Sequence, residues 1–254
     1  MDFGGFDLAS LLPFIAVGFA AQMVDGALGM AFGVISNTML VAVLGVPPAA
    51  ASQRVHLVEC FTTATSGISH LLHDNIDKKL FFRLLVPGIA GGVLGAYVLS
   101  SIDGIVMKPF VLIYLTAIGF WLLVRGLLYP PRLKEAKFIA PLGLVGGFLD
   151  AAGGGGWGPV VTSNLLIQGA DPRKVVGTVN SVEFFLTLTV SIAFIWHLGI
   201  ADVAGATLGL LIGGVAAAPI GAWAAKKIPV KPILIMVGVV LIATSLFGIY
   251  KAWF

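Results

Sequence analysis

Cysteine and charged residues are scarce in this sequence. Cys60 is its one cysteine, which excludes an intrachain disulfide and a cysteine-rich metal site. Charged residues make up 11% of the 254 positions, whereas soluble domains carry roughly 25%. The sequence also lacks the G-x-x-x-x-G-K-S/T loop that binds ATP phosphates. We therefore expect neither a soluble domain nor a transporter that hydrolyses ATP.

Apolar residues, in contrast, are abundant along the whole chain. They make up 58% of it, and the mean hydropathy is +1.03. Runs such as Phe82 to Leu99 approach the ~20 residues that cross a bilayer and are apolar on all sides, which favours helices over the alternating strands of a barrel. Lysine and arginine gather in short loops, so the net charge of +3 indicates topology and no nucleic-acid partner. The sequence predicts an all-α polytopic integral membrane protein.

The chain contains an internal repeat. DGALGMAFG at 25–33 is answered by DAAGGGGWG at 150–158, and VHLVECF at 55–61 by VNSVEFF at 179–185. Such a period marks one duplicated structural unit. We predict a first transmembrane repeat at 1–128, a basic cytoplasmic connector at 129–137, and a second transmembrane repeat at 138–254.

Each repeat divides into a glycine-broken segment followed by three helices. The broken segments span about 8–45 and 138–168, and the helices 49–72, 82–100 and 107–128 in the first repeat and 174–196, 203–224 and 231–253 in the second. Positive loop charge changes sides between the repeats: Lys78, Lys79 and Arg83 follow the first helix of repeat one, whereas Lys226, Lys227 and Lys231 follow the second helix of repeat two. The positive-inside rule therefore places the repeats upside down relative to each other.

This inversion requires an odd number of crossings in each repeat. The broken segment must then enter and leave the membrane on one side, as two short helices or a re-entrant hairpin, giving about five membrane segments per repeat. Both termini are predicted outside. Inverted repeats with broken helices in matching positions are typical of secondary transporters, whose substrate site lies between the repeats.

The run Gly153 to Pro159 is the first candidate site. Irregular backbone at membrane depth needs partners or lines a cavity, and a helix beginning near Pro159 would direct free N–H groups at an anion. Glycines that only allow close helix packing are the alternative, also for the weaker match at Gly29 and Gly33. Asp25 and Asp150 are expected either to cap the following helices or to carry protons.

A polar stripe on the first full helix of each repeat is the second candidate. Its members follow helical spacing in register in both repeats: His56, Glu59, Thr63, Ser66 and His70, and Asn180, Glu183, Thr187 and Ser191. A glutamate at equal depth in both repeats must face the interior or a cavity, where it can exchange a proton. Glu59 and Glu183 are the leading functional candidates, with permanent protonation or helix bonding as the alternative. His56 is expected to donate to an anion, join a proton relay, or stay neutral and buried.

These motifs carry a family resemblance. The duplicated D-x-x-x-G-x-x-x-G pattern, Gly153 to Pro159, Gly177-Thr178 and Gly221-Ala222 resemble the TauE/SafE family of sulfite and organosulfonate exporters. The resemblance implies a secondary transporter of the bacterial cytoplasmic membrane that has no cofactor and moves a small sulfur oxyanion outward. The sequence departs from the family pattern in having Ser52-Gln53 in place of a Gly-Thr pair, and glutamate on both stripes.

We therefore predict a proton-coupled exporter of sulfite or an organosulfonate that works by alternating access, not an enzyme. Its partners are the small anion, protons and the lipid bilayer; a homo-oligomer is compatible with the sequence. The proton-coupling residues are Glu59, Glu183, Asp25 and Asp150, and no metal site is expected. The predicted substrate-binding residues are Gly29, Gly33, His56, Gly153, Gly154, Gly155, Gly156, Trp157, Gly158, Gly177, Thr178, Asn180 and Ser181.

Two alternatives stay open at this point. If the intramembrane carboxylates remain ionised, they suit a cation or metal transporter better than an anion exporter. A membrane-embedded enzyme would need a nucleophile, a base and an orienting group, and only His56 and Glu59 on one helix approach such a set.

Overall fold

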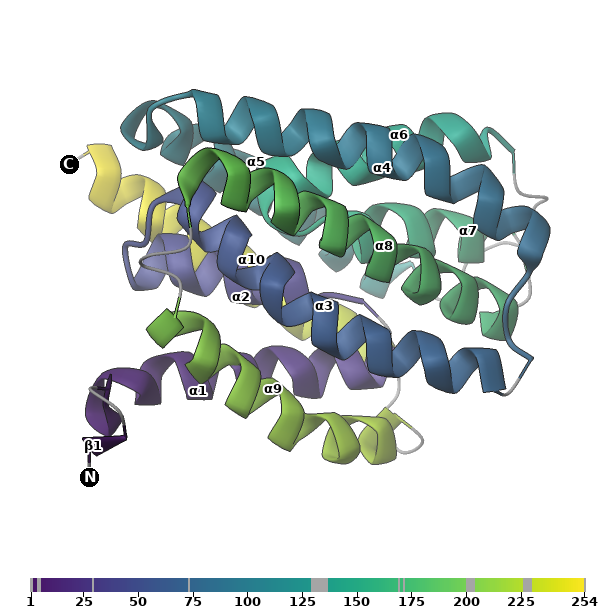
Figure 1. The fold of residues 1–254 in the computed structure, drawn as a ribbon, viewed down its shortest axis with the longest axis horizontal. Helices are drawn as coiled ribbons and strands as arrows, with labels where there is room; N and C mark the ends of the chain where they lie inside the picture. The colour runs from purple at the N-terminus through teal and green to yellow at the C-terminus, as the bar shows by residue number, and fades with distance from the viewer. Residues whose placement is uncertain are drawn as a thin grey trace.

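A computed structural model describes residues 2–3, 6–28, 30–72, 74–128, 137–168, 170, 172–199, 204–225 and 230–253. Within these ranges the chain forms ten α-helices, two short π-helical segments and a two-stranded hairpin (Figure 1). The elements are β1 (Asp2–Phe3), β2 (Phe6–Asp7), α1 (Leu8–Leu28), α2 (Phe32–Thr38), η1 (Met39–Val43), α3 (Pro48–Leu72), α4 (Lys78–Ser101), α5 (Gly104–Leu127), α6 (Ile139–Gly153), η2 (Trp157–Thr162), α7 (Ser163–Ile167), α8 (Pro172–Leu198), α9 (Ala204–Ala225) and α10 (Val230–Trp253).

The predicted helical class is confirmed, and most elements begin near the predicted positions. Two predicted starts were wrong: α4 begins four residues before Phe82, and α5 three residues before Met107. In both cases an aspartate caps the helix. The Asp77 side chain accepts from the N–H groups of Lys79 and Leu80, and that of Asp103 accepts from the N–H of Ile105. These caps satisfy N–H groups that have no partner within the helix, so the helix extends into the charged loop.

Among the described residues, three helices are by length and composition able to cross a membrane: α4, α5 and Lys174–Leu198 of α8. Shorter apolar helices flank the breaks at both glycine motifs. Figure 1 shows α1 running along one edge of the bundle and α2 turning back from its end, so the two form a hairpin. Contacts place the far end of this hairpin beside the end of α10, where Ala42 lies against Gly248. The start of α3 is close by, with Pro47 and Pro48 beside Gly104 at the start of α5.

Helices pack in pairs that join the first half of the chain to the second. α1 packs on α9 and α4 packs on α6 at opposite edges of the bundle, with α3 and α8 between them (Figure 1). Both edge pairs are parallel, since residues rise together along the two helices. Gly88, Gly91 and Gly95 of α4 meet successive turns of α6, and Gly209 and Gly213 of α9 meet successive turns of α1. In contrast, α3 runs antiparallel to α8, and α5 to α10, as the contacts Gly119–Ile242 and Gly126–Ile235 show for the latter.

Glycine is required at the edge pairs because the backbones touch. A Cβ on Gly213 would lie 2.1 Å from the carbonyl oxygen of Ile15, and one on Gly91 would lie 2.0 Å from that of Leu144. Small residues permit this close approach of membrane helices, which compensates for the absence of a hydrophobic driving force between helices in lipid. The edge pairs therefore depend on backbone contact, not on large interlocking side chains.

We predict that Gly213→Ala lowers the free energy of unfolding of the purified protein by about 1–3 kcal/mol, because the added methyl group separates α9 from α1. Gly214→Ala is the matched control, since the nearest atom to its Cβ lies 3.6 Å away. Unfolding followed by circular dichroism in detergent measures both. Equal losses in the two variants would contradict the packing argument.

Candidate functional site

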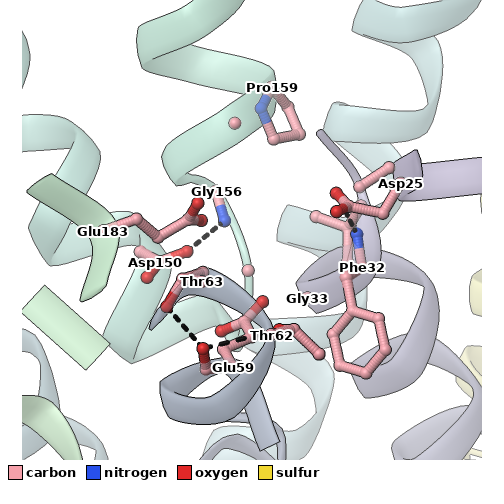
Figure 2. Close-up of a pocket in the computed structure, with 14 residues that line it drawn as sticks. Asp25, Phe32, Gly33, Glu59, Thr62, Thr63, Asp150, Gly156, Pro159 and Glu183 are labelled. Atoms are coloured by element: carbon pink, nitrogen blue, oxygen red, sulfur yellow. Dashed lines mark hydrogen bonds between the residues drawn. The ribbon is translucent and has the colours of Figure 1, made fainter. Parts of the chain in front are cut away.

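A cavity lies where the two interrupted helices meet. One interruption is between α1 and α2 and the other is between α6 and η2; we call these two segments the breaks. The space in the cavity that a water molecule can occupy is about 20 Å³, room for about one water molecule in this conformation. Elements from both halves of the chain form its wall (Figure 2). The lining residues are Asp25, Ala31, Phe32, Gly33, Val34, Glu59, Thr62, Thr63, Asp150, Gly155, Gly156, Gly158, Pro159 and Glu183.

The backbones of the two breaks touch at glycine. A Cβ on Gly33 would lie 2.8 Å from Cα of Gly155, and one on Gly155 would lie 2.2 Å from the nitrogen of Val34. Gly154 and Gly155 also have positive φ values of 70° and 137°, which glycine adopts without a steric penalty. Ala31, at the start of α2, has φ 108° and is a strained position in the cavity wall.

Two side chains of the first half hold carbonyl groups of the second break. The amide nitrogen of Asn37 donates to the Gly153 oxygen at 2.7 Å, and the Tyr114 hydroxyl donates to the Gly155 oxygen at 3.0 Å. Inside a membrane such carbonyl groups have no bulk water to bind, so a protein donor is needed. These two bonds direct the carbonyl groups of the break toward α2 and α5.

The aspartates of the repeated motif bind the N–H groups of the breaks. Oδ1 of Asp150 accepts from the N–H groups of Gly156 at 2.8 Å and Trp157 at 3.0 Å, and Oδ1 of Asp25 accepts from Phe32 at 3.3 Å. Both aspartates therefore cap the helical segment that follows, one of the two roles predicted for them. Some of the N–H groups that we expected to face an anion thus bind the chain's own carboxyl groups.

Both glutamates of the polar stripes line the same cavity. Figure 2 shows the carboxyl groups of Glu183 and Asp150 on one side, that of Asp25 on the opposite side, and Glu59 below them in the view. Glu59 is only 4% exposed, and its Oε2 is buried without a hydrogen-bond partner. No lysine or arginine is among the lining residues. In the described part of the chain, no group of three or more His, Cys, Asp or Glu side chains is placed to hold a metal ion.

His56 lies behind the cavity wall, fully buried, and contacts both halves of the chain. Its Nε2 is 3.1 Å from Oδ2 of Asp150, and its Nδ1 is 2.7 Å from the carbonyl oxygen of Ser52. The Ser52 hydroxyl in turn donates to the Ala151 oxygen at 2.8 Å. His56 therefore connects α3 to the aspartate that caps η2.

Trp157 and the residues at the start of α8 lie outside the cavity lining. The indole of Trp157 is fully buried, donates to the Val179 oxygen at 3.2 Å, and packs on Gly88 and Gly146. The Thr178 hydroxyl accepts from the N–H of Asp77 at 2.8 Å. These residues fix the position of α8 relative to its neighbours.

Other predicted residues are also placed away from the lining. Gly177 packs against Asn75, the Asn180 amide donates to the Ser66 hydroxyl, and the Ser181 hydroxyl donates to the Gly177 oxygen. Gly29 falls outside the described residues, as does the connector 129–137 apart from Lys137.

Sequence reasoning missed Asn37, Tyr114 and Thr62. A partial signal for Asn37 was present, because Ser36-Asn37 recurs as Ser163-Asn164, two residues beyond the register of the repeated motif. Tyr114 lies within an apolar helix in a stretch without an evident match in the other half. Its role follows only from the packing of α5 against the break.

The fold and the site together define a polytopic helical membrane transporter with a central, acid-lined cavity. The sequence profile of the family described as Sulfite exporter TauE/SafE matches residues 14–248, and the chain belongs to this family. It is a transporter and not an enzyme.

Two relatives carry similar descriptions. The chain is 41% identical to a probable membrane transporter protein, YtnM, of Bacillus subtilis. The match covers 97% of this chain and 85% of the relative. It is 23% identical, over 98% of both chains, to a probable membrane transporter protein of Haemophilus influenzae. No solved structure matches the chain.

We predict that Asn37→Ala lowers the free energy of unfolding by about 1–3 kcal/mol, because the buried Gly153 carbonyl loses its donor. Asn164→Ala is the matched control from the other half, since the Asn164 amide donates to the Val160 oxygen one turn earlier in its own half. Thermal unfolding in detergent compares the two. An Asn37 variant as stable as the Asn164 variant would contradict a structural role for the bond between the halves.

Proposed function

We propose that this chain exports a small sulfur oxyanion, sulfite or an organosulfonate, across the bacterial cytoplasmic membrane by proton-coupled secondary transport. The observation that carries the proposal is the cavity itself. Four carboxyl groups, two from each half, meet there beside the start of α2 and of η2. Membership of the TauE/SafE family supports the substrate class and the outward direction.

The two halves, 1–128 and 138–254, act in this proposal as inverted repeats. The most extensive helix contacts support it, because exchanging the halves turns them into one another: α1 with α9 becomes α6 with α4, and α4 with α8 becomes α9 with α3. The pairs α3 with α8 and α5 with α10 are antiparallel, as a two-fold axis in the membrane plane requires. Figure 1 shows α1 beginning and α10 ending at the same end of the bundle. With the loop charges, this arrangement supports both termini outside.

Proton binding is part of the proposed mechanism because four carboxyl side chains line the cavity. An anion cannot approach four ionised carboxylates without large repulsion in a low-dielectric site. When Glu59 and Glu183 are protonated, their part of the repulsion disappears and their O–H groups become donors. Gly33 and Val34, in the first turn of α2, line the same wall, and N–H groups in the first turn of a helix have no partner within the helix. Anion and proton therefore bind together and cross in the same direction, so net export follows an outward gradient of the substrate itself.

Alternating access requires two ends of the cavity that open in turn. The antiparallel pair α3 and α8 supplies a contact at each end. The Gln53 amide donates to the Gly199 oxygen at 2.8 Å at one end, and the Asp77 N–H donates to the Thr178 hydroxyl at the other. Each contact joins the first turns of one helix to the loop after its partner. Breaking one while keeping the other would open the cavity to one side of the membrane.

One observation favours a second candidate, the transport of a cation. The four carboxyl groups have no lysine or arginine beside them in the lining, so in their ionised form they would attract a cation. Competition separates the two functions. Excess sulfite inhibits flux if the anion is the substrate, whereas excess sodium or a divalent cation inhibits it if a cation is.

We predict that proteoliposomes take up a labelled organosulfonate faster when the outside is more acidic than the lumen. A sulfonate stays ionised across neutral pH, so the gradient acts through the protein. Glu59→Gln and Glu183→Gln should reduce this stimulation about tenfold or more, within the range of removing a positioned proton-transfer group.

Glu135→Gln is the control for this assay. Glu135 is the one other glutamate of the sequence besides Glu59 and Glu183, and it lies in the predicted connector. It should keep the wild-type response. Folded wild-type protein that moves neither sulfite nor a sulfonate would overturn the proposed substrate. Unchanged stimulation in both stripe variants would overturn the role of the glutamates.

Inverted topology makes a separate prediction about labelling. In a variant with Cys60→Ser, a cysteine at Asp103 or Gly199 should react with a membrane-impermeant maleimide added outside intact cells. A cysteine at Asp74, which is fully exposed, should react only after the membrane is permeabilised. Labelling of Asp103→Cys and Gly199→Cys from opposite sides would exclude the inversion, because both loops are predicted outside.

A further inference from the structure

The contact between His56 and Asp150 joins two buried groups that need a proton between them. The Nδ1 of His56 faces the carbonyl oxygen of Ser52 at 2.7 Å, and a carbonyl oxygen can only accept. Nδ1 therefore carries a hydrogen. The Ser52 hydroxyl, 3.3 Å from Nδ1, already donates to Ala151, so it offers Nδ1 a lone pair. The tautomer is thus fixed by the neighbours of the ring.

With Nδ1 protonated, the other ring nitrogen decides the state of the pair. Nε2 lies 3.1 Å from Oδ2 of Asp150, and a hydrogen bond there requires one further proton, on the nitrogen or on the oxygen. Without it, a lone pair and a carboxylate oxygen would face each other in a nearly solvent-free contact, since His56 and Asp150 are 0% and 2% exposed. The contact exists only when the proton is present.

The carboxyl group of Asp150 also binds the backbone between α6 and η2. While Oδ2 faces His56, Oδ1 accepts from the N–H groups of Gly156 and Trp157, which begin η2. His56 also lies on the face of α3 that carries Glu59 one turn later. Gain or loss of a proton at Oδ2 therefore affects three features together: the contact with α3, the glycine wall of the cavity and the position of Glu59.

The pair spans the two halves and has no counterpart when the halves are exchanged. Asn180 stands where the repeat would place a second histidine, and its amide binds the Ser66 hydroxyl. Asp25, the counterpart of Asp150, accepts from Phe32. The two halves thus share a cavity but differ in this proton site.

We propose that His56 and Asp150 share one exchangeable proton, and that its binding and release couple proton movement to the glycine break that lines the substrate cavity. The inference rests on the proposed transport function and assigns its coupling proton to a specific pair. His56 is in this view a positioning residue that holds a proton, not a direct ligand of the anion.

Other titratable groups face this site from four helices. Glu59 on α3, Glu183 on α8 and Tyr114 on α5 lie within electrostatic reach of Asp150, and Asp25 on α1 within reach of the two glutamates. When the glutamates are ionised, their charge favours keeping the shared proton. When they bind protons of their own, that influence weakens, so loading of the cavity and release from the pair are linked.

Two substitutions fix the pair in opposite states. In Asp150→Asn, the amide oxygen can still accept from Gly156 and Trp157, while the amide nitrogen donates to Nε2 of His56. In His56→Gln, an amide nitrogen donates to Oδ2 of Asp150, which then stays ionised. Both variants keep a donor facing an acceptor, and neither can exchange the shared proton. Controls that leave the site intact are Asp103→Asn and His197→Gln, each outside the cavity lining.

The first measurement is the stability of purified protein between pH 6.5 and 9, which needs no substrate. In an unfolded chain, histidine and aspartate lose their protons near pH 6.5 and pH 3.9, so the proposal requires the folded chain to hold one proton more than the unfolded chain above about pH 6.5. The pair then makes the unfolding equilibrium constant rise about tenfold per pH unit until its proton leaves. Its stabilisation is present below pH ~6.5 and is lost as pH rises.

Asp150→Asn and His56→Gln, which we call the locked variants, should lack this part of the pH dependence of stability. The controls Asp103→Asn and His197→Gln should keep it. The second measurement is sulfonate uptake with and without a pH gradient, in which the ratio of the two fluxes should fall to about one in the locked variants and remain at the wild-type value in the controls. If either locked variant keeps the wild-type dependence of stability on pH, the pair does not share the proton. If stability loses that dependence but the flux ratio is unchanged, the proton is not the coupling proton.

Failure of the proposed function is distinguishable from these outcomes. Wild-type protein without oxyanion flux would reject the substrate, whereas the stability profiles would still decide whether His56 and Asp150 exchange a proton.

Discussion

One carboxyl group, that of Asp150, satisfies the backbone at the point where the second broken helix stops. Its Oδ1 accepts from two consecutive N–H groups, and its Oδ2 faces His56. Backbone polar groups at membrane depth need protein partners, so this interaction permits the chain to break there at all. The cavity, the contact of the two glycine breaks and the entry of α3 into the site all depend on it.

Close helix packing provides the second condition for the site. Glycines of α4 and α9 bring their backbones against α6 and α1, so each edge of the bundle combines elements from both halves. The central pair α3 and α8 is left to carry the polar stripes, and it directs Glu59 and Glu183 to one cavity. Edge and centre thus have different chemistry: apolar backbone contact outside, and carboxyl groups with few partners inside.

Much of this arrangement could be predicted because it follows from local patterns. Apolar runs gave the helices, and the repeated aspartate, glycine and glutamate positions gave the groups that line the cavity. The contacts across the chain could not be predicted. Nothing in a linear pattern relates Tyr114 to Gly155, or His56 to Asp150, since these pairs are separated by 41 and 94 residues and meet only through helix packing. The caps at Asp77 and Asp103 were not predicted, because the helix starts were placed by the apolar runs, which begin after the charged residues.

The parallel pairing of α1 with α9 has a consequence for how the protein is made. A ribosome releases α1 almost two hundred residues before its partner, so the face that will receive Gly209 and Gly213 first contacts lipid or the insertion machinery. Neither half can bury its own first helix. Assembly of this membrane protein must therefore be completed after synthesis of α9, and a truncated nascent chain would expose an unfilled helix surface to quality-control proteases.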